Sequence, residues 1–335
     1  MLILSQSEVE RLLPMGECIE VMASTLAALA RGDAVLPLRT MILIPDSTDV
    51  FAVMPAYIGA PPTIGAKIIT YFPRNHGTRY DSHQGAVLLF DPETGSLAAI
   101  LDATAVTTIR TAAVTAVATR LLARKDASTL AIIGAGVQGH VHVASLCAVR
   151  PIKRLQVWSR TRAHAERLAA AAREKHGLDA VVAATAADVC RGADIVCTTT
   201  SAREPVLMGE WLEPGTHVNA VGASHRTARE VDTRTVVRSR LYVDRRESAL
   251  KEPGDILVPL EEGAITPDHI VAEVGELLIG RGQGGGRRDD REITLFKSLG
   301  LAIEDLAAAS HAVDAARRQG VGVSIELGGA RHAAH

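Results

Sequence analysis

Six residues near the middle of the chain, Gly134-Ala135-Gly136-Val137-Gln138-Gly139, have the spacing of a phosphate-binding loop. They follow an apolar run at residues 130–133 and precede a helical pattern that continues to residue 148. In this order the first glycine permits a tight turn, the second lets backbone approach a pyrophosphate, and the third lets helix and strand pack closely. The helix N-terminus attracts the phosphates. The motif predicts a dinucleotide site contacted by Gly134, Gly136, Val137, Gln138 and Gly139.

The residues after the next predicted strand distinguish two dinucleotides. About 20 residues past such a motif, NAD sites place an Asp or Glu on the ribose 2′-hydroxyl. This chain has Ser159, Arg160 and Thr161 there, and no carboxylate. A guanidinium and two hydroxyls suit a 2′-phosphate. The segment favours NADPH, while NADH stays open as an alternative.

More candidate cofactor contacts stand at the ends of later strands. Carboxyl ends of parallel strands face the ligand crevice in this kind of sheet. The hydroxyl-bearing or small residues there are Thr198, Thr199, Thr200, Val221 and Gly222. Ser298 and Gly300, near the start of the last predicted helix, are also expected to approach the nicotinamide. Lys297 could do the same or lie on an ordinary helix surface.

Strand and helix patterns alternate around these residues. Apolar segments at 129–133, 155–158, 180–183, 195–198, 217–220 and 241–243 are separated by helical stretches such as 162–176. This order predicts an α/β fold with a parallel sheet. Residues 280–290 are rich in glycine and charge, which is typical of a surface loop. Residues 294–318 are predicted to form one long amphipathic helix.

The N-terminal third has a different pattern. Ser5 and Ser7 precede an amphipathic run that predicts a helix over residues 8–30, stopped by Gly32. Short apolar segments at 38–44, 50–56, 64–72, 86–90 and 97–101 then alternate with turn residues, which predicts a meander of strands. A helix over 104–123 leads into the glycine motif.

Composition narrows the class of protein. The 335 residues carry 36 basic and 38 acidic side chains, so the net charge is 36 − 38 = −2, and only 3% of residues are aromatic. That excludes a basic, stacking surface for nucleic acid. No apolar stretch reaches the ~18 residues of a membrane helix, and early charges argue against a signal peptide. The four cysteines have no CxxC pairing, so we expect a cytoplasmic protein.

Histidine spacing argues against a metal site. His140 and His142 are two residues apart on a predicted helix, so their side chains point about 200° apart. No other group has zinc-ligand spacing. We therefore expect no bound metal.

Several short segments occur in a specific joint order along almost the whole chain. They include Met54-Pro55-Ala56, Gly65-Ala66-Lys67, His83-Gln84-Gly85, Thr108-Ile109-Arg110-Thr111-Ala112-Ala113, Gly209-Glu210-Trp211 and Phe296-Lys297-Ser298-Leu299-Gly300. With the glycine motif, this order resembles the ornithine cyclodeaminase/mu-crystallin family of NAD(P)-dependent enzymes. The resemblance is strongest to the ketimine reductase, or mu-crystallin-like, branch.

The resemblance implies an architecture. A Rossmann dinucleotide-binding domain at residues 125–295 would be inserted into an α/β domain for substrate binding and dimerisation, formed by residues 1–124. Residues 296–335 would return to that first domain as a C-terminal helix. The resemblance also implies a homodimer paired through the N-terminal sheets, and a substrate cleft between the domains.

The resemblance also implies roles for individual residues. Arg39, Lys67 and Arg110 match family positions that hold the substrate carboxylate, and Met54 and His83 would line the substrate, although His83 could equally be structural. A guanidinium can grip a carboxylate with two hydrogen bonds. Lys67 is flanked by Ala66 and Ile68, and a lysine buried in an apolar strand is costly unless paired.

One departure from the family pattern bears on the reaction. True cyclodeaminases carry an aspartate where this chain has Ser224, and a serine is a poor general base without help. The sequence therefore favours NADPH-dependent reduction of a 2-carboxy ketimine, such as Δ1-pyrroline-2-carboxylate or Δ1-piperideine-2-carboxylate, to the L-amino acid. Lys67, Arg110 and Ser224 are the expected catalytic residues, with Lys67, or a water held by Ser224, giving the proton.

Three alternatives stay open. The chain could be an ornithine cyclodeaminase, which makes proline and ammonia from ornithine. It could be an amino-acid dehydrogenase of the alanine dehydrogenase type, which runs the same chemistry on an acyclic imine. It could also bind NADP(H) and a ligand without turnover.

Overall fold

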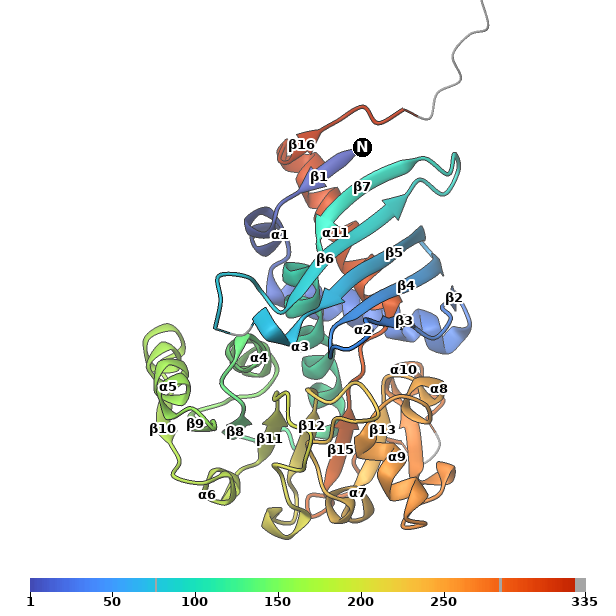
Figure 1. The fold of residues 1–335 in the computed structure, drawn as a ribbon. Coiled ribbons are helices and arrows are strands. Elements are labelled where there is room, and N and C mark those ends of the chain that lie inside the picture. Colours follow the sequence, from blue (N-terminus) through green and yellow to red (C-terminus); the bar gives the residue numbers. More distant parts are fainter. Residues whose placement is uncertain (76, 283–284, 329–335) are drawn as a thin grey trace, which may run out of the picture. The chain divides into compact units, whose positions relative to one another are not determined.

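The computed structural model describes residues 1–75, 77–282 and 285–328, which form two units (Figure 1). The first unit holds Met1–Arg110 and the chain from Leu301 onward, and the second unit holds Thr111–Gly300. The division falls within helix α3 (Ala103–Leu122) and after Gly300, whereas the sequence placed it after residues 124 and 295. The first boundary differs because α3 is one continuous helix that runs from one unit into the other. The second boundary differs because residues 294–297 form a strand of the second unit's sheet.

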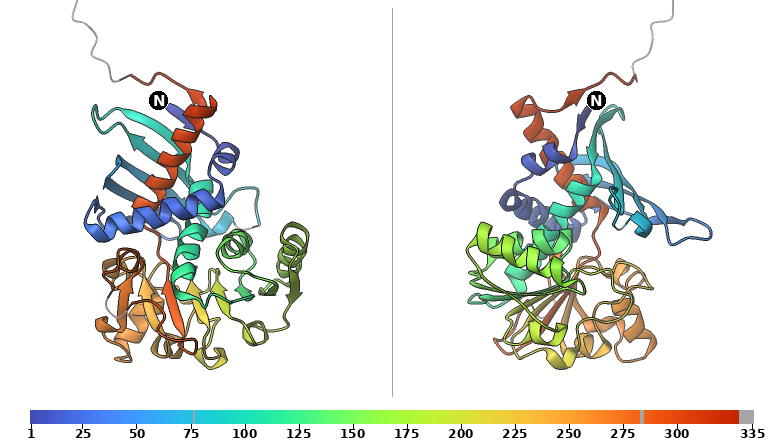
Figure 2. Two further views of the ribbon diagram at one scale, coloured as in Figure 1. Left: turned by 180° about the vertical axis from the view of Figure 1, so that it is seen from behind. Right: turned by 60° about the vertical axis from the view of Figure 1, so that its left-hand side comes forward.

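The first unit is built on a sheet with the order β16-β1-β7-β6-β5-β4-β2, and β3 also pairs with β4. Its strands are β1 (Leu2–Leu4), β2 (Ala34–Val35), β3 (Thr40–Leu43), β4 (Val50–Gly59), β5 (Pro62–Tyr71), β6 (His83–Phe90), β7 (Leu97–Asp102) and β16 (Val323–Ser324). Strands β4 to β7 pair antiparallel in chain order, which confirms the predicted meander. Helix α11 (Ala302–Gln319) packs on β4, β5 and β6 and against α2 (Met15–Arg31), covering one face of the sheet (Figure 2).

The predicted helix over residues 8–30 is wrong in one respect, because the structure has two helices there. Helix α1 (Gln6–Leu12) ends before Pro14, and α2 begins at Met15. Pro14 has extended backbone angles, φ −59° and ψ 140°. Proline lacks an N–H and disfavours helical geometry in the residue before it, so the pattern breaks there. Gly32 ends α2 with φ 87°, as expected.

The second unit is a parallel sheet with the order β10-β9-β8-β11-β12-β15-β13-β14. Its strands are β8 (Thr129–Ile133), β9 (Arg154–Trp158), β10 (Asp179–Val182), β11 (Ile195–Thr198), β12 (His217–Ala220), β13 (Arg240–Val243), β14 (Ile270–Glu273) and β15 (Thr294–Lys297). Its α-helices are the end of α3, α4 (Val137–Val149), α5 (Arg162–His176), α6 (Ala186–Cys190), α7 (Thr233–Arg238), α8 (Arg246–Ala249), α9 (Gly254–Glu261) and α10 (Val274–Leu278). The predicted parallel α/β fold is confirmed. The strand order reverses beside β8, which is where such sheets bind ligands.

The predicted helix over residues 294–318 is also wrong at its start. Residues 294–297 form strand β15, which pairs with both β12 and β13, and α11 begins only at Ala302. Leu295, Phe296 and Lys297 are fully buried in that sheet. Pairing on both sides outweighs the helical periodicity that the segment shares with the residues after it.

The helices in the described ranges are short or polar compared with a membrane span. No single one is long and apolar enough, and only α1 with α2 passes, as a bent pair and by length and composition alone.

Two histidines of the second unit are buried and uncharged. His142 Nδ1 donates to the Gln138 carbonyl at 2.8 Å, and His217 lies 2.9 Å from the Thr294 hydroxyl and 3.1 Å from Asn219 Oδ1. Burial lowers the pKa of His142 to about 4 and that of His217 to about 3. An unfolded chain binds these protons near pH 6.5, so acid favours unfolding.

We therefore expect the free energy of unfolding to fall by about 2 kcal/mol per histidine between pH 8 and pH 5. Urea unfolding at the two pH values measures this. His142→Asn should shrink the difference, whereas replacing the exposed His164 with glutamine should not. Equal pH dependence in the His142→Asn variant and the parent would contradict the assignment.

Candidate active site

Two positions of the glycine loop in the second unit, Gly134 and Gly139, have no room for a side chain. Gly134 has φ 106°, and a Cβ there would lie 2.8 Å from the Thr199 carbonyl oxygen. A Cβ on Gly139 would lie 2.3 Å from the Gly134 carbonyl oxygen. Gly136 instead faces open space at the N-terminus of α4, and Val137 is exposed beside it. The loop thus leaves room for a phosphate where backbone N–H groups begin a helix, so these residues fit a dinucleotide.

The carboxyl end of β9 carries the residues expected at the adenosine ribose. Ser159 is half-buried, while Arg160 and Thr161 are exposed. Arg162 forms an ion pair with Glu166, in which its Nε lies 2.8 Å from Glu166 Oε1. Within the described part of the chain, Arg160 has no such hydrogen bond or ion pair. Its guanidinium can therefore bind an anion without breaking a contact.

The ends of β11 and β12 come close to the glycine loop. The Thr199 hydroxyl donates to the Gly134 carbonyl at 2.8 Å, which joins the β11 end to the phosphate loop. The Val221 N–H donates to the Thr198 carbonyl at 3.0 Å, which joins the β12 end to β11. Thr200 and Gly222 follow these residues in the same two loops. Ser224 is half-buried further along the β12 loop.

Lys297, the last residue of β15, and two residues after it, Ser298 and Gly300, complete this edge of the sheet. The Ser298 N–H donates to the Ala220 carbonyl at 3.0 Å, and the Gly300 N–H donates to Asp244 at 2.8 Å. Lys297 is fully buried, and its Nζ lies 2.9 Å from Asp255 Oδ2. The helix-surface alternative for Lys297 is therefore wrong, because the residue ends a strand in the middle of a sheet.

The first unit holds a buried cluster of two cations and two carboxylates. Lys67 Nζ on β5 lies 2.7 Å from Asp305 Oδ2. Arg110 on α3 donates from Nε to Asp305 Oδ1 at 2.8 Å and from Nη1 to Glu304 at 2.7 Å. All four side chains are at most 5% exposed. Glu304 and Asp305 stand in the first turn of α11, so this helix fixes both cations.

Burial lowers the pKa of Lys67 to about 8. Asp305 opposes the shift, while the charges of Arg110 and Arg39 add to it. An ammonium with this pKa is protonated at neutral pH and gives up its proton readily, as a general acid must. Its Nζ also donates to the Thr107 hydroxyl at 3.4 Å.

The structure brings some of the expected substrate residues together. Met54 is buried and pairs directly with Lys67 across β4 and β5. Arg39 is half-buried, and its charge acts on Lys67. His83 is exposed at the start of β6, where its ring lies 4.4 Å from that of Tyr71. His83 pairs with Tyr71 in the β5–β6 register, whereas Lys67 pairs with Val87 in the middle of β6.

Sequence reasoning missed Glu304 and Asp305. A signal for them existed, because a lysine in an apolar strand needs a counter-charge. Two adjacent acids in the apolar context Leu301-Ala302-Ile303 are unusual for a buried helix face. Which acid meets which cation depends on tertiary packing.

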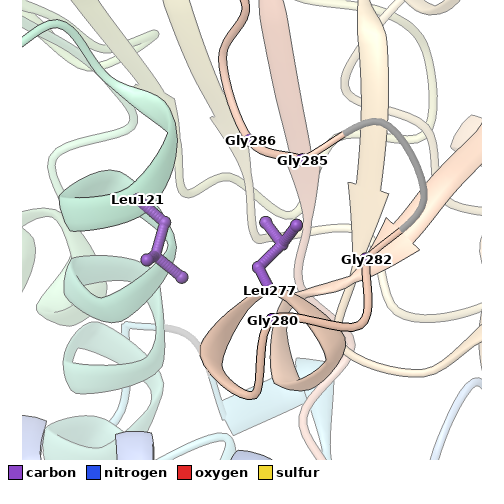
Figure 3. Close-up of a pocket in the computed structure, with 6 residues that line it drawn as sticks. All are labelled: Leu121, Leu277, Gly280, Gly282, Gly285 and Gly286. Atoms are coloured by element: carbon purple, nitrogen blue, oxygen red, sulfur yellow. The ribbon is translucent and has the colours of Figure 1, made fainter.

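A cavity in the second unit carries no such chemistry. It has a volume of about 180 Å³ and is lined by Leu121, Leu277, Gly280, Gly282, Gly285 and Gly286 (Figure 3). Its lining has no ionisable or hydroxyl side chain. The described residues contain no group of three His, Cys, Asp or Glu side chains placed to hold a metal.

Comparison with known proteins agrees with this arrangement. The sequence model of a family described as the ornithine cyclodeaminase/mu-crystallin family matches residues 1–320. The chain belongs to this family. The resemblance drawn from the short segments is thereby confirmed. One curated family relative, ketimine reductase mu-crystallin of Mus musculus, is 40% identical over 283 residues, which cover 84% of this chain and 86% of the relative.

Two solved structures share the whole fold. Δ1-pyrroline-2-carboxylate reductase of Thermococcus litoralis, in complex with NADH and L-proline, is 39% identical with a TM-score of 0.94, covering 97% of this chain and 100% of that one. An archaeal alanine dehydrogenase dimer with bound NAD is 32% identical with a TM-score of 0.92, covering 98% and 99%. Both relatives hold a nicotinamide cofactor.

Proposed function

We propose that this protein uses NADPH to reduce the C=N bond of a cyclic 2-carboxy ketimine, of the Δ1-pyrroline-2-carboxylate or Δ1-piperideine-2-carboxylate type, to the L-amino acid. The observation that carries the proposal is the buried Lys67–Arg110 cluster, in a chain whose relatives are named for reducing such substrates. A guanidinium held by two carboxylates is rigid, so it can orient a substrate carboxylate.

The two cations have different tasks in this reaction. Arg110, assisted by Arg39, binds the carboxylate and so selects which face of the imine is presented. Lys67 gives a proton to the imine nitrogen, which makes the adjacent carbon a better hydride acceptor. The nicotinamide supplies the hydride when bound in the second unit. Ser224 orients substrate or a water, but its hydroxyl does not take over a carboxylate's work as a base.

An assay panel tests the proposal. Purified protein is mixed with NADPH and either cyclic ketimine, and loss of the reduced nicotinamide absorbance is followed with amino-acid analysis of the product. Proline or pipecolate formed one-to-one with NADPH oxidation supports ketimine reduction. Proline and ammonia from ornithine without net oxidation would support a cyclodeaminase. Turnover only with pyruvate and ammonia would support a dehydrogenase, and NADPH binding without turnover a binding protein.

The preference for NADPH over NADH rests on Arg160. Arg160→Ser removes a charge-assisted contact with the 2′-phosphate, which is worth about 10- to 100-fold in affinity. We expect the KM for NADPH to rise by about that factor, and the KM for NADH to change less than twofold. Steady-state kinetics with both cofactors measures this.

Arg162→Ser is the matched control, because Arg162 is already paired with Glu166. It should leave both KM values almost unchanged. Equal losses with NADPH and NADH in Arg160→Ser would contradict recognition of the 2′-phosphate.

We also propose a homodimer formed through the first unit's sheet. The face of the sheet opposite α11 is apolar and at least partly exposed. Its residues include Val53, Pro55, Ile64, Ala66, Ile68, Leu88 and Phe90. An apolar patch of this kind on a sheet is typical of an interface, and the alanine dehydrogenase relative is a dimer. Sedimentation at twice the 35.4 kDa chain mass supports the proposal, and a monomer at micromolar concentration would contradict it.

A further inference from the structure

A buried carboxylate in the second unit has no part in the chemistry described so far. Glu230 is 0% exposed, and both of its oxygens accept hydrogen bonds. Oε1 accepts from the Thr200 N–H at 2.6 Å and from the Thr200 hydroxyl at 2.8 Å. Oε2 accepts from the Gly222 N–H at 2.6 Å and from the Thr198 hydroxyl at 2.9 Å. One side chain thus joins the loops that follow β11 and β12.

The chemistry of these contacts requires a carboxylate. The two backbone N–H groups can only donate, and each meets a different oxygen of Glu230. Two accepting oxygens are what an ionised carboxylate offers and what an amide lacks. Its own backbone is fixed by Asp255 Oδ1, which accepts from the Glu230 N–H at 2.7 Å. Asp255 in turn pairs with Lys297, which supplies positive charge at this end of the sheet.

Strand order assigns these loops to one half of a dinucleotide. The glycine loop follows β8, and the ribose-selecting residues follow β9, on one side of β8 in the sheet. Strands β11 and β12 lie on the other side of β8 (Figure 1). A dinucleotide whose pyrophosphate crosses the glycine loop and whose adenosine lies over β8 and β9 extends its nicotinamide half over β11 and β12.

From this arrangement we infer that Glu230 is a positioning residue for the nicotinamide half of the cofactor, acting through the Thr198–Thr200 and Gly222 backbone and hydroxyl groups that it holds. The inference rests on the dinucleotide cofactor of the proposed function. It adds that ordering of the nicotinamide end depends on one buried charge that does not itself touch the ligand. Adenosine recognition at β8 and β9 does not depend on this charge.

The variant Glu230→Gln tests binding of the nicotinamide half and the adenosine half of the cofactor separately. The glutamine amide group places a donor against one of the N–H donors, so one loop loses its acceptor. Isothermal titration calorimetry with NADPH should show Kd raised about tenfold or more. Titration with adenosine 2′,5′-bisphosphate, which carries only the adenosine half, should show Kd within twofold of the parent protein. An unchanged Kd for NADPH, or an equal loss for both ligands, would overturn the inference.

Two further variants keep the test decisive. Asp194 accepts from the Ser128 and Thr129 N–H groups at 2.8 and 2.9 Å, at the amino end of β8 and β11, so Asp194→Asn is the matched control. This control variant should lower the free energy of unfolding without weakening NADPH binding more than adenosine 2′,5′-bisphosphate binding. Should Glu230→Gln fail to fold, Gly222→Ala perturbs the same loops, because its Cβ would lie 2.0 Å from the Thr200 carbonyl oxygen. It should show the same selective loss. A parent protein that binds NADPH but reduces no ketimine would refute the proposed function and leave this inference standing.

Discussion

Replacing Lys67 with methionine is expected to reduce kcat for ketimine reduction about a thousandfold, with a smaller effect on NADPH binding. General acid catalysis contributes about 10²–10⁴-fold, and methionine fills the lysine's volume without a proton to give. The pH profile should change as well. Because the Lys67 pKa is lowered to about 8, the protonated form is lost as pH rises through that value. The parent kcat/KM should therefore fall above pH 8, and the variant should lack that alkaline limb.

Lys175→Met is the control, since Lys175 is exposed on α5 of the second unit. It should keep both the parent rate and the parent pH profile. Full kcat in Lys67→Met would show that the proton comes from elsewhere, and a water held by Ser224 would then be the donor to test.

Asp305→Asn is expected to have the second largest effect, on stability and on the pH profile together. It leaves Lys67 and Arg110 buried without the carboxylate that both contact. Removing one member of a buried ion network typically costs about 3–5 kcal/mol. Asp305 also raises the Lys67 pKa, so its loss lowers that pKa further below its ordinary value. The alkaline limb of kcat/KM should move to lower pH, which reduces activity at pH 7.

Asp314→Asn on the same helix is the matched control. Asp314 is exposed and lies 3.8 Å from Arg317, so its loss should leave the unfolding curve and the pH profile nearly unchanged. Urea unfolding and the pH dependence of kcat/KM measure both effects. An alkaline limb that stays at the parent position would show that Asp305 does not set the protonation of Lys67.

The elements of the fold that can be predicted from the sequence are those determined by the residue pattern of a short segment. The glycine motif with its flanking strand and helix predicted the phosphate loop, since each glycine meets a local steric demand. The alternation of strands predicted the meander and the parallel sheet. The local pattern predicts a helix where strand β15 lies, because the pairing of β15 with β12 and β13 is made with residues far away in the chain.

The same difference between local pattern and long-range packing applies to the residues of the candidate site. Lys67 stood out because a charge in an apolar strand is costly wherever it lies. Glu304, Asp305 and Glu230 did not, because an acidic residue in a helix or loop is usually solvated. Only packing shows that these three are fully buried and what each of them binds.

The ion pairs of Arg110 also bear on how a domain can be inserted into another. Residues 111–300 leave the first unit directly after Arg110 and rejoin it at Leu301, a few residues before Glu304. Arg110 Nη1 and Glu304 Oε2 lie 2.7 Å apart, so this ion pair joins the two places at which the chain of the first unit is interrupted. A host closed in this way needs little of the insert to keep its own shape. Arg110, the side chain proposed to hold the substrate carboxylate, is thus also one partner of the ion pair that closes this junction.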